Sequence, residues 1–96
     1  MNDPALLILT SLSSGAKHGH ALLLDIESFA GVRLGPGTLY GAITRLEERG
    51  LIEPLEADDR RRPYCITAAG TAALGESLSE LSRIVVTATT RLAAAT

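Results

Sequence analysis

The sequence predicts a mainly α-helical fold with a small β-hairpin, and three observations carry this prediction. Hydrophobic residues make up 46% of the 96-residue chain and aromatic residues only 3%, so aliphatic side chains must build the core, which favours packed helices. Four segments repeat apolar residues at helical spacing, and each lies between residues that begin or end helices. Residues 51–66 change instead to an extended pattern on either side of a charged turn.

Two apolar helices are expected at the start of the chain. Asp3 is a good N-cap for a helix that begins at Pro4 and ends near residues 13–15, and its many apolar residues predict burial. A second helix begins at residue 18 or 19 and ends at Gly31, with leucine, isoleucine and phenylalanine at helical spacing. Together they supply the first part of the core.

The third helix is the most informative element for function. Residues 32–34 are too few for more than an edge strand, and the helix follows from about Pro36 to Arg49, ending at Gly50. One face is apolar and packs on the core, while the opposite face is polar and free to meet a partner. The apolar face comprises Leu39, Ile43 and Leu46, and the polar face comprises Thr38, Tyr40 and Arg45.

A hairpin and a long helix complete the chain. Residues 51–55 and 62–66 are expected to pair as antiparallel strands across a polar turn at 56–60, and Pro54 argues for an edge position. Thr67 then caps a helix whose apolar residues alternate at spacings of four and three, a heptad seam suited to contact with a second chain. The expected dimer interface comprises Leu6, Leu9, Leu74, Leu78, Leu81, Val85, Ala88 and Leu92.

Helix, helix, strand, helix, hairpin and helix follow one another in the order of a winged helix-turn-helix. Residues 1–66 then form a DNA-binding domain and residues 67–96 a dimerisation helix, together one compact unit. In this arrangement the third helix enters the major groove, and the hairpin, or wing, lies over the backbone. A homodimer sets its two third helices about 34 Å apart, so that each reads one half-site of a palindromic operator in double-stranded DNA.

Net charge alone does not favour DNA, because the chain has a formal charge of -2 and affinity rests on neutralising phosphates. The local distribution of charge is more favourable to DNA binding. The first turns of the helix at 36–49 carry no acidic residue, and residues 60–62 are three consecutive arginines in the wing. The expected DNA-binding residues are Lys17, His18, His20, Pro36, Gly37, Thr38, Tyr40, Arg45, Arg60, Arg61 and Arg62.

The candidates on the third helix each have a structural alternative. The hydroxyl of Thr38 can bond phosphate or a base edge, and the ring of Tyr40 can lie against a sugar or a thymine methyl. Alternatively, Thr38 caps its helix and Tyr40 packs in the core. Arg45 contacts DNA or pairs with Glu48, three residues further along the helix.

The other candidates also have two interpretations. Arginines 60–62 are expected on phosphate or in a narrow minor groove, where arginine is favoured, or else they pair with Asp58 and Asp59. Residues 17–20 precede or open the second helix, where backbone donors face an anion, but His18 also suits a helix cap.

Several functional classes are disfavoured. Cys65 is the single cysteine, which excludes an intrachain disulfide and a cysteine-rich zinc site. His18 and His20 lack the acidic partner and ligand number of a catalytic or metal site, so we expect no enzyme, no metal and no cofactor. With neither a signal peptide nor a long apolar run in view, we expect a cytoplasmic protein that does not enter the membrane and joins the nucleoid when bound to DNA.

Several motifs resemble those of one known family. They are residues 7–20, Gly35-Pro-Gly-Thr-Leu-Tyr40, Arg45-Leu-Glu-Glu-Arg-Gly-Leu-Ile52, Arg61-Arg-Pro-Tyr64 and Thr67-Ala-Ala-Gly70, and together they are similar to the PadR family of bacterial transcriptional regulators. The resemblance covers nearly the whole chain. It implies a homodimer joined through the last helix, which represses from palindromic operator DNA and is released by small aromatic or hydrophobic compounds. Gly35 and His20 depart from the family pattern, where a serine cap and a tyrosine are common.

Three alternatives stay open at this point. A winged helix also serves as a protein-interaction or dimerisation module, and the acidic balance of the chain suits a protein partner. A small effector would bind near the dimer seam, between the first and last helices, but the aromatic residues Phe29, Tyr40 and Tyr64 offer no stacking platform like a tryptophan pair. A redox switch at Cys65 is a lesser hypothesis.

Overall fold

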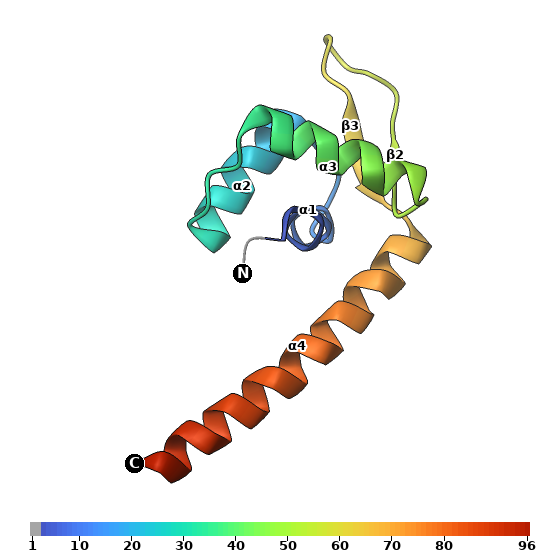
Figure 1. Ribbon diagram of the computed structural model, residues 1–96. Coiled ribbons are helices and arrows are strands. Elements are labelled where there is room, and N and C mark those ends of the chain that lie inside the picture. The colour runs from blue at the N-terminus through green and yellow to red at the C-terminus, as the bar shows by residue number, and fades with distance from the viewer. Residues whose placement is uncertain (1–2) are drawn as a thin grey trace.

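Four helices and a three-stranded sheet make up the computed structural model, which describes residues 3–96. Helices α1 to α3 and the sheet form a body, from which α4 projects as a long arm (Figure 1). The predicted winged helix-turn-helix with a long C-terminal helix is confirmed. The elements are α1 (Pro4–Leu12), β1 (Lys17–His18), α2 (Gly19–Ala30), α3 (Pro36–Glu48), β2 (Ile52–Pro54), β3 (Pro63–Ile66) and α4 (Ala68–Ala95).

Side-chain caps fix the starts of three helices. The Asp3 carboxylate accepts hydrogen bonds from amides in the first turn of α1, the shorter of them 3.0 Å long. His18 Nδ1 accepts from the Ala21 amide at 3.4 Å and begins α2. Thr67 Oγ1 accepts from the Gly70 amide at 3.0 Å and begins α4. Each cap satisfies a backbone donor that has no partner within the helix, so the helices start where the sequence predicts.

The sheet differs from the prediction in one strand. Its order is β1-β3-β2, and β3 pairs antiparallel with both neighbours. The prediction of an edge strand at residues 32–34 is wrong. These residues form the irregular link between α2 and α3, and Leu34 is buried in the core. The edge strand is β1, in which His18 lies opposite Pro63 of the wing. The start of α2 is therefore attached to the base of the wing, while Pro54 lies in the other edge strand as predicted.

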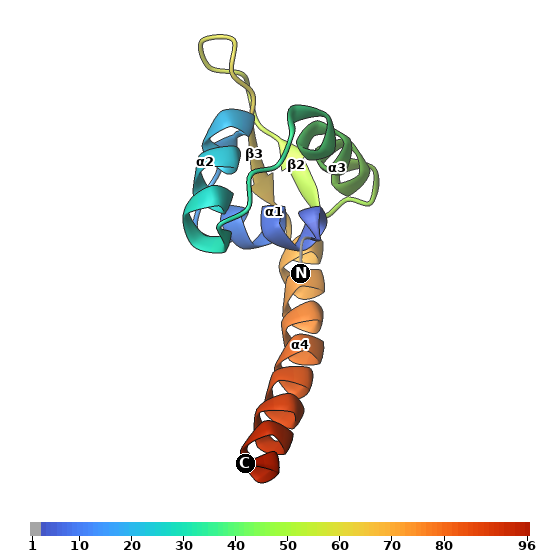
Figure 2. The same ribbon diagram turned by 60° about the vertical axis from the view of Figure 1, so that its left-hand side comes forward.

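The core is aliphatic and centred on α1. It comprises Leu7, Ile8, Leu9, Leu12, Leu22, Ile26, Leu34, Leu39, Ala42, Ile43, Leu46, Leu51, Ile52 and Leu74. Ser11 is buried among them, and its hydroxyl donates a 2.6 Å hydrogen bond to Asp25 of α2, which satisfies the polar group. With α2 and α3 both fixed on α1, their N-terminal ends open on the same side of the body as the wing (Figures 1 and 2).

Helix α4 has a packed root and a free end. At the root, Gly70 and Leu74 are buried, and a Cβ on Gly70 would lie 2.0 Å from the Leu51 carbonyl oxygen. Only glycine allows α4 to approach the end of α3 this closely. Beyond Leu81 every residue of α4 is exposed, and Figure 2 shows this end standing clear of the body. Helix α4 follows its N-cap Thr67, and its root is part of the core.

Candidate nucleic-acid interface

Three elements meet at one groove on the side of the wing. The groove has a volume of about 320 Å³ and lies between the first turn of α2, the first turns of α3 and the wing, which comprises residues 52–66. We call it the wing groove. It is lined by His18, Gly19, His20, Tyr40, Arg60, Arg61, Arg62 and Tyr64. Six of these residues are candidates from the sequence, and the fold brings them together from positions more than 40 residues apart.

Tyr40 forms one wall of the wing groove. Its side chain is 49% exposed, so the alternative that it packs in the core is wrong. The ring lies over the first turn of α2, where a Cβ on Gly19 would come within 2.3 Å of the Tyr40 hydroxyl oxygen. Gly19 was not a candidate from the sequence, because nothing in the local pattern shows which side chain lies against a glycine. The glycine allows the phenol to rest directly on the helix start.

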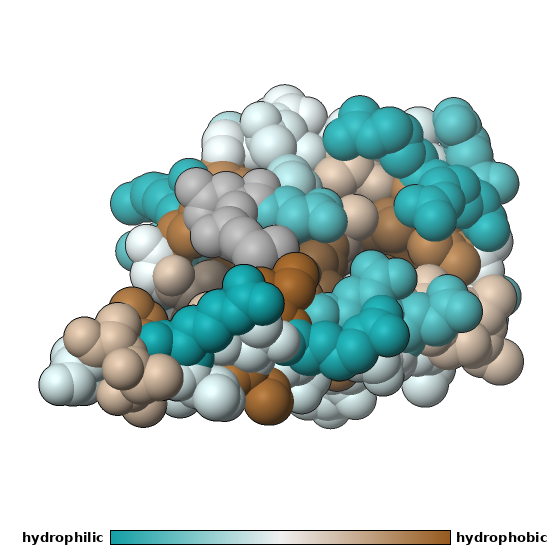
Figure 3. All heavy atoms as spheres, turned by 60° about the horizontal axis from the view of Figure 1, so that its bottom comes forward, coloured by the Kyte–Doolittle hydropathy of each residue, from teal (hydrophilic) through white to brown (hydrophobic). Residues whose placement is uncertain are grey.

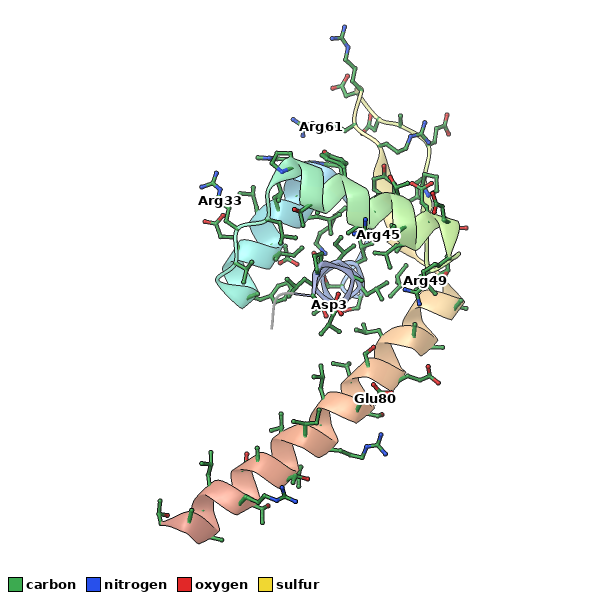
Figure 4. All side chains as sticks on the ribbon, in the orientation of Figure 1. Asp3, Arg33, Arg45, Arg49, Arg61 and Glu80 are labelled. Carbon is green, nitrogen blue, oxygen red and sulfur yellow. The ribbon has the colours of Figure 1, made fainter. Side chains whose placement is uncertain are left out.

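His18 and Arg61 lie at the centre of the groove. The imidazole Nδ1 of His18 accepts the capping bond from Ala21, so a neutral ring carries its proton on Nε2. The Arg61 guanidinium is 3.5 Å from this nitrogen. Both groups are then donors and cannot bond to each other, but a single oxygen anion could accept from both. Figure 4 shows Arg61 extending from the wing back over the start of α2 and α3.

The other two wing arginines have different surroundings. Arg62 donates to the Leu55 carbonyl across the hairpin at 3.3 Å, whereas the Arg60 guanidinium has no hydrogen-bond partner within residues 3–96. The sequence left open that the arginines pair with Asp58 and Asp59. Neither acid forms an ion pair within the part of the chain that the structure describes, where the two pairs are Lys17–Asp25 and Arg33–Glu27. The wing cations therefore stay available to an external anion.

Tyr64 and Cys65 lie in β3 at the base of the wing. Burial raises the pKa of the Tyr64 hydroxyl, the Glu47 carboxylate raises it further, and Arg62 partly opposes them. Burial also raises the pKa of the Cys65 thiol, as do the charge of Glu53 and a hydrogen bond to its carboxylate. A raised pKa leaves less of the reactive thiolate, which argues against a redox switch at Cys65.

Lys17 does not belong to this surface. Its ammonium group turns inward, donates to the Ser11 carbonyl and to the Ser14 hydroxyl at 2.8 Å, and lies 4.0 Å from the Asp25 carboxylate. The side chain is only 19% exposed. The lysine thus satisfies carbonyl groups at the end of α1 and lies beside Asp25 of α2, an arrangement that residue type alone does not reveal. Lys17 therefore lies outside the surface that the other candidate DNA contacts share.

Thr38 and Arg45 lie on another flank of α3. Because an α-helix turns about 100° per residue, these two project about 20° apart, whereas Tyr40 projects about 140° from Arg45. The N-cap of α3 is Gly35, and the hydroxyl of Thr38 has no partner within residues 3–96, so the capping alternative is wrong. Arg45 forms no ion pair with Glu48 among the described residues. Figure 4 shows Arg45 farther along α3 than the wing groove.

The helix starts that face this side lack negative charge. Neither α2 nor α3 has an acidic residue in its first turn, as the sequence predicts for α3. Pro36 and Gly37 are exposed at the start of α3, where the free backbone amides and the helix dipole favour an anion. The exposed acids Glu47 and Glu48 lie at the opposite end of α3. The start of α3 is therefore far better suited to phosphate than its end.

The predicted dimer residues separate into two groups. Leu9 and Leu74 are only 5% and 7% exposed, so they are core residues with little area left for a partner, and Leu6 is half-buried. Val85 and Leu92 are 59% and 70% exposed on the free end of α4. Viewed towards that end, apolar surface alternates with charged surface (Figure 3). We call Leu78, Leu81, Val85, Ala88 and Leu92 the α4 seam.

No three side chains of the metal-binding types gather within residues 3–96. Among the helices of this same range, none has both the length and the apolar composition needed to cross a bilayer.

The fold and the groove define the class of this chain as a winged helix-turn-helix protein with a cationic surface beside its third helix. The chain belongs to the Transcriptional regulator PadR-like family, whose model matches residues 8–76. The resemblance seen in the sequence is thereby confirmed. Since the members of this family are transcriptional regulators, the role of the chain is regulatory and not enzymatic.

Individual relatives agree with this membership. The transcriptional regulator Rv3488 of Mycobacterium tuberculosis (strain ATCC 25618 / H37Rv) is 41% identical over 85 residues, which are 82% of this chain and 78% of that protein. A 37.1 kDa protein in transposon TN4556 of Streptomyces fradiae is 45% identical over 83 residues, or 86% of this chain. The matched part is 24% of that relative, so the chain spans about a quarter of its length.

A solved structure shows the same fold. A PadR family transcription regulator from Clostridium difficile R20291 superposes with a TM-score of 0.83 at 22% identity. The superposition covers 93% of this chain and 97% of that one. At this level of identity the likeness concerns the architecture, including the long last helix, and not the site residues.

Proposed function

We propose that this chain is a DNA-binding transcriptional regulator that acts as a homodimeric repressor on a palindromic operator. The observation that carries the proposal is the wing groove, in which the starts of α2 and α3 meet the arginines of the wing. Helix starts and unpaired guanidinium groups on one surface are suited to a line of phosphates. The cytoplasm is the expected compartment, and the nucleoid the expected location of the DNA-bound form.

Helix α3 is the proposed recognition element. Thr38, Arg45 and the exposed backbone at Gly37 would face the major groove, where side chains reach base edges. On the other flank, Tyr40 would lie against the sugar-phosphate backbone, and the His18–Arg61 pair would hold a phosphate oxygen between two donors. His20 would contribute a further donor at the start of α2. The two flanks would thus divide base reading from backbone positioning.

The α4 seam is the proposed dimer contact. Helix α4 has 28 residues and is therefore about 42 Å long, and all its residues beyond Leu81 are exposed. An isolated apolar helix of this kind gains most of its stability by packing. Two seams packed around a two-fold axis would support a spacing of about 34 Å between recognition helices, and occupancy of the operator would block a promoter.

The root of α4 gives the dimer contact a route to α3. The Thr67 amide donates to the Leu51 carbonyl at 3.1 Å, and the Thr67 hydroxyl donates to the Gly50 carbonyl at 2.7 Å, directly after α3 ends. A change in the angle between two α4 helices would therefore move the recognition helices. We include in the proposal that a small hydrophobic effector between α1 and α4 releases DNA by this route, through preferential binding to one dimer geometry.

The test is a fluorescence-anisotropy titration with DNA from the region upstream of the chain's own gene. We compare the unmodified protein with Tyr40→Ala, with a triple Arg60, Arg61 and Arg62→Ala variant, and with Arg33→Ala as a control outside the groove. Saturable binding should be weakened by the first two changes and not by the control. The triple variant should also reduce the slope of log affinity against log salt by up to about 2.7.

The main alternative is a protein-interaction module. It predicts no binding to any of these DNA fragments, even at about 50 mM salt, where phosphate contacts are strongest. Circular dichroism of each variant separates a lost contact from a lost fold. A folded protein that never binds DNA would overturn the proposed function.

A further inference from the structure

Gly41 lies in the middle of α3, where its packing gives no reason for a glycine. Glycine is one of the least favourable residues in a helix interior. Gly19 and Gly70 are explained by atoms that a Cβ would meet at 2.3 Å and 2.0 Å. A Cβ on Gly41 would meet one atom within 4 Å outside the nearby helix backbone, the Nη1 of Arg45, at the ordinary contact distance of 3.5 Å. The neighbour of Gly41 among residues 3–96 is thus a guanidinium group.

This contact shows how the side chain of Arg45 runs. Arg45 follows Gly41 by four residues, or about 6 Å along the helix axis. Its guanidinium nevertheless lies beside Gly41, so the side chain points back towards the start of α3, the direction that helical side chains favour. It forms no ion pair with Glu48 in the part of the chain that the structure describes. The charged group therefore lies over the bare backbone of the glycine.

The guanidinium thereby approaches the level of Thr38 on the same flank of α3. Thr38 precedes Gly41 by three residues, which is about 4.5 Å along the helix axis. This distance is comparable with the rise of about 3.4 Å between successive base pairs. Two groups with this separation on one flank of a helix can face neighbouring base pairs in a major groove.

We propose that Arg45 reads one guanine in each half-site, and that Gly41 is a positioning residue that leaves room for its guanidinium. The inference rests on the proposed function as a DNA-binding regulator. Guanine presents two acceptors, N7 and O6, at its major-groove edge, and the forked guanidinium can donate to both. A methyl group at position 41 would still fit at van der Waals distance, whereas a longer side chain would occupy the place of the guanidinium.

The test changes single atoms of the operator. The operator is mapped by footprinting, and each guanine of one half-site is replaced in turn by 7-deazaguanine or by hypoxanthine. The first lacks the N7 acceptor, and the second keeps N7 and O6 but lacks the amino group in the minor groove. At one position, 7-deazaguanine should weaken binding of the unmodified protein about tenfold, the size of one good base contact. Hypoxanthine at the same position should leave the affinity nearly unchanged.

The protein is varied against the same DNAs. Arg45→Ala should bind the guanine and 7-deazaguanine operators alike, because the group that reads N7 is gone. Gly41→Leu should lose this preference too, although Arg45 is still present. Gly41→Ala is the matched control and should keep the preference. Alanine and leucine both favour a helix over glycine, so circular dichroism should show both Gly41 variants folded.

Three results would overturn the inference and leave the proposed function intact. In the first, the unmodified protein binds its operator but tolerates 7-deazaguanine at every position. In the second, Arg45→Ala binds more weakly with a reduced salt slope but keeps the preference for guanine, which would make Arg45 a phosphate contact. In the third, Gly41→Leu keeps the full preference, so that the glycine positions nothing. If the unmodified protein bound none of the DNAs, the proposed function itself would fail, and the inference with it.

Discussion

The wing tip and the free end of α4 are the two parts of this chain that project from the body, and they expose opposite chemistry (Figure 2). The wing presents three arginines on a short hairpin whose turn contains two residues with positive φ. The free end of α4 presents leucine and valine on a regular helix, with Val85 and Leu92 more than half exposed.

The chemistry of each projecting segment indicates the kind of partner that the segment suits. Unpaired guanidinium groups at a surface are suited to phosphate, and exposed aliphatic side chains at heptad spacing are suited to a second helix. Both segments depend on the same core, since the wing is joined to α2 through β1 and the root of α4 is bonded to the end of α3. Mutations can therefore test the contributions of the core, the free end of α4 and the wing one at a time.

The largest effect is expected at the root of α4, which packs on the same core that carries the wing. Gly70→Ala places a methyl group 2.0 Å from the Leu51 carbonyl oxygen, and buried backbone cannot move away cheaply. We expect a loss of about 3 kcal/mol in the free energy of unfolding. Gly75→Ala is the matched control, because its methyl meets open space and should stabilise α4 by about 1 kcal/mol. Urea denaturation measures both, and equal stability of the two variants would contradict the packing at Gly70.

The second-largest effect is expected in the α4 seam, where a mutation should change the dimer contact and leave the wing unaltered. Val85→Glu places a carboxylate in each half of the proposed α4 seam, at a cost of several kcal/mol per buried charge. We expect the dimer dissociation constant to rise at least about 100-fold, with the fold of the monomer intact. Thr87→Glu, on the opposite face of the same helix, should leave it nearly unchanged. Sedimentation velocity over a range of concentrations gives both values, and a loss shared equally by the two variants would place the dimer contact elsewhere.

A smaller effect should appear in the wing groove alone. Gly19→Ala would bring a methyl group within 2.3 Å of the Tyr40 hydroxyl, and the end of this side chain can swing away at little cost to stability. We expect a melting temperature near that of the unmodified protein but an affinity for DNA lower by about tenfold, as for loss of one good contact. Combining Gly19→Ala with Tyr40→Ala should add no further loss, which a double-mutant cycle would check. Additive losses would show that Gly19 acts independently of Tyr40.

The smallest effect concerns the base of the wing and uses Cys65 as a reporter. Because burial and the Glu53 carboxylate raise the pKa of this thiol, less thiolate is present at pH 8 than in an ordinary cysteine. Alkylation by iodoacetamide should therefore be slow, and Glu53→Gln should accelerate it by removing the negative charge. Val85→Glu should leave the rate unchanged, since the α4 seam is remote from β3. A rate that follows the oligomeric state would contradict this separation of the two regions.

Most of the fold could be predicted because its signals are local. The caps at Asp3, His18 and Thr67 and the proline at the start of α3 each act within one helical turn, so residue type and spacing locate them. The strand β1 could not be predicted, because pairing of two residues with the distant wing depends on how the helices pack. For the same reason the expected strand at 32–34 was wrong: an extended segment becomes a strand only where a partner lies beside it.

The residues of the candidate site also fall into those that the sequence could predict and those that it could not. Tyr40 and the wing arginines could be selected from the sequence because their exposure follows from helix face and turn composition. The inward turn of Lys17, the contact between Gly19 and Tyr40, and the proximity of Arg61 to His18 could not, because each depends on the packed arrangement of elements. Helical geometry alone places Thr38 and Arg45 on a different flank of α3 from Tyr40. Which of the two flanks faces the wing depends on the packing of α3.

Helical periodicity, caps and charge are carried by neighbouring residues, so the helices, the wing hairpin, the family resemblance and the surface chemistry could be read without the structure. Which of those residues lie side by side depends on how the elements pack. The packing places Lys17, Leu9 and Leu74 inside the fold, joins α2 to the wing, and gathers the wing arginines with His18, His20 and Tyr40 in one groove. Contacts between distant segments are selected by packing of the whole core, which no single stretch of sequence contains.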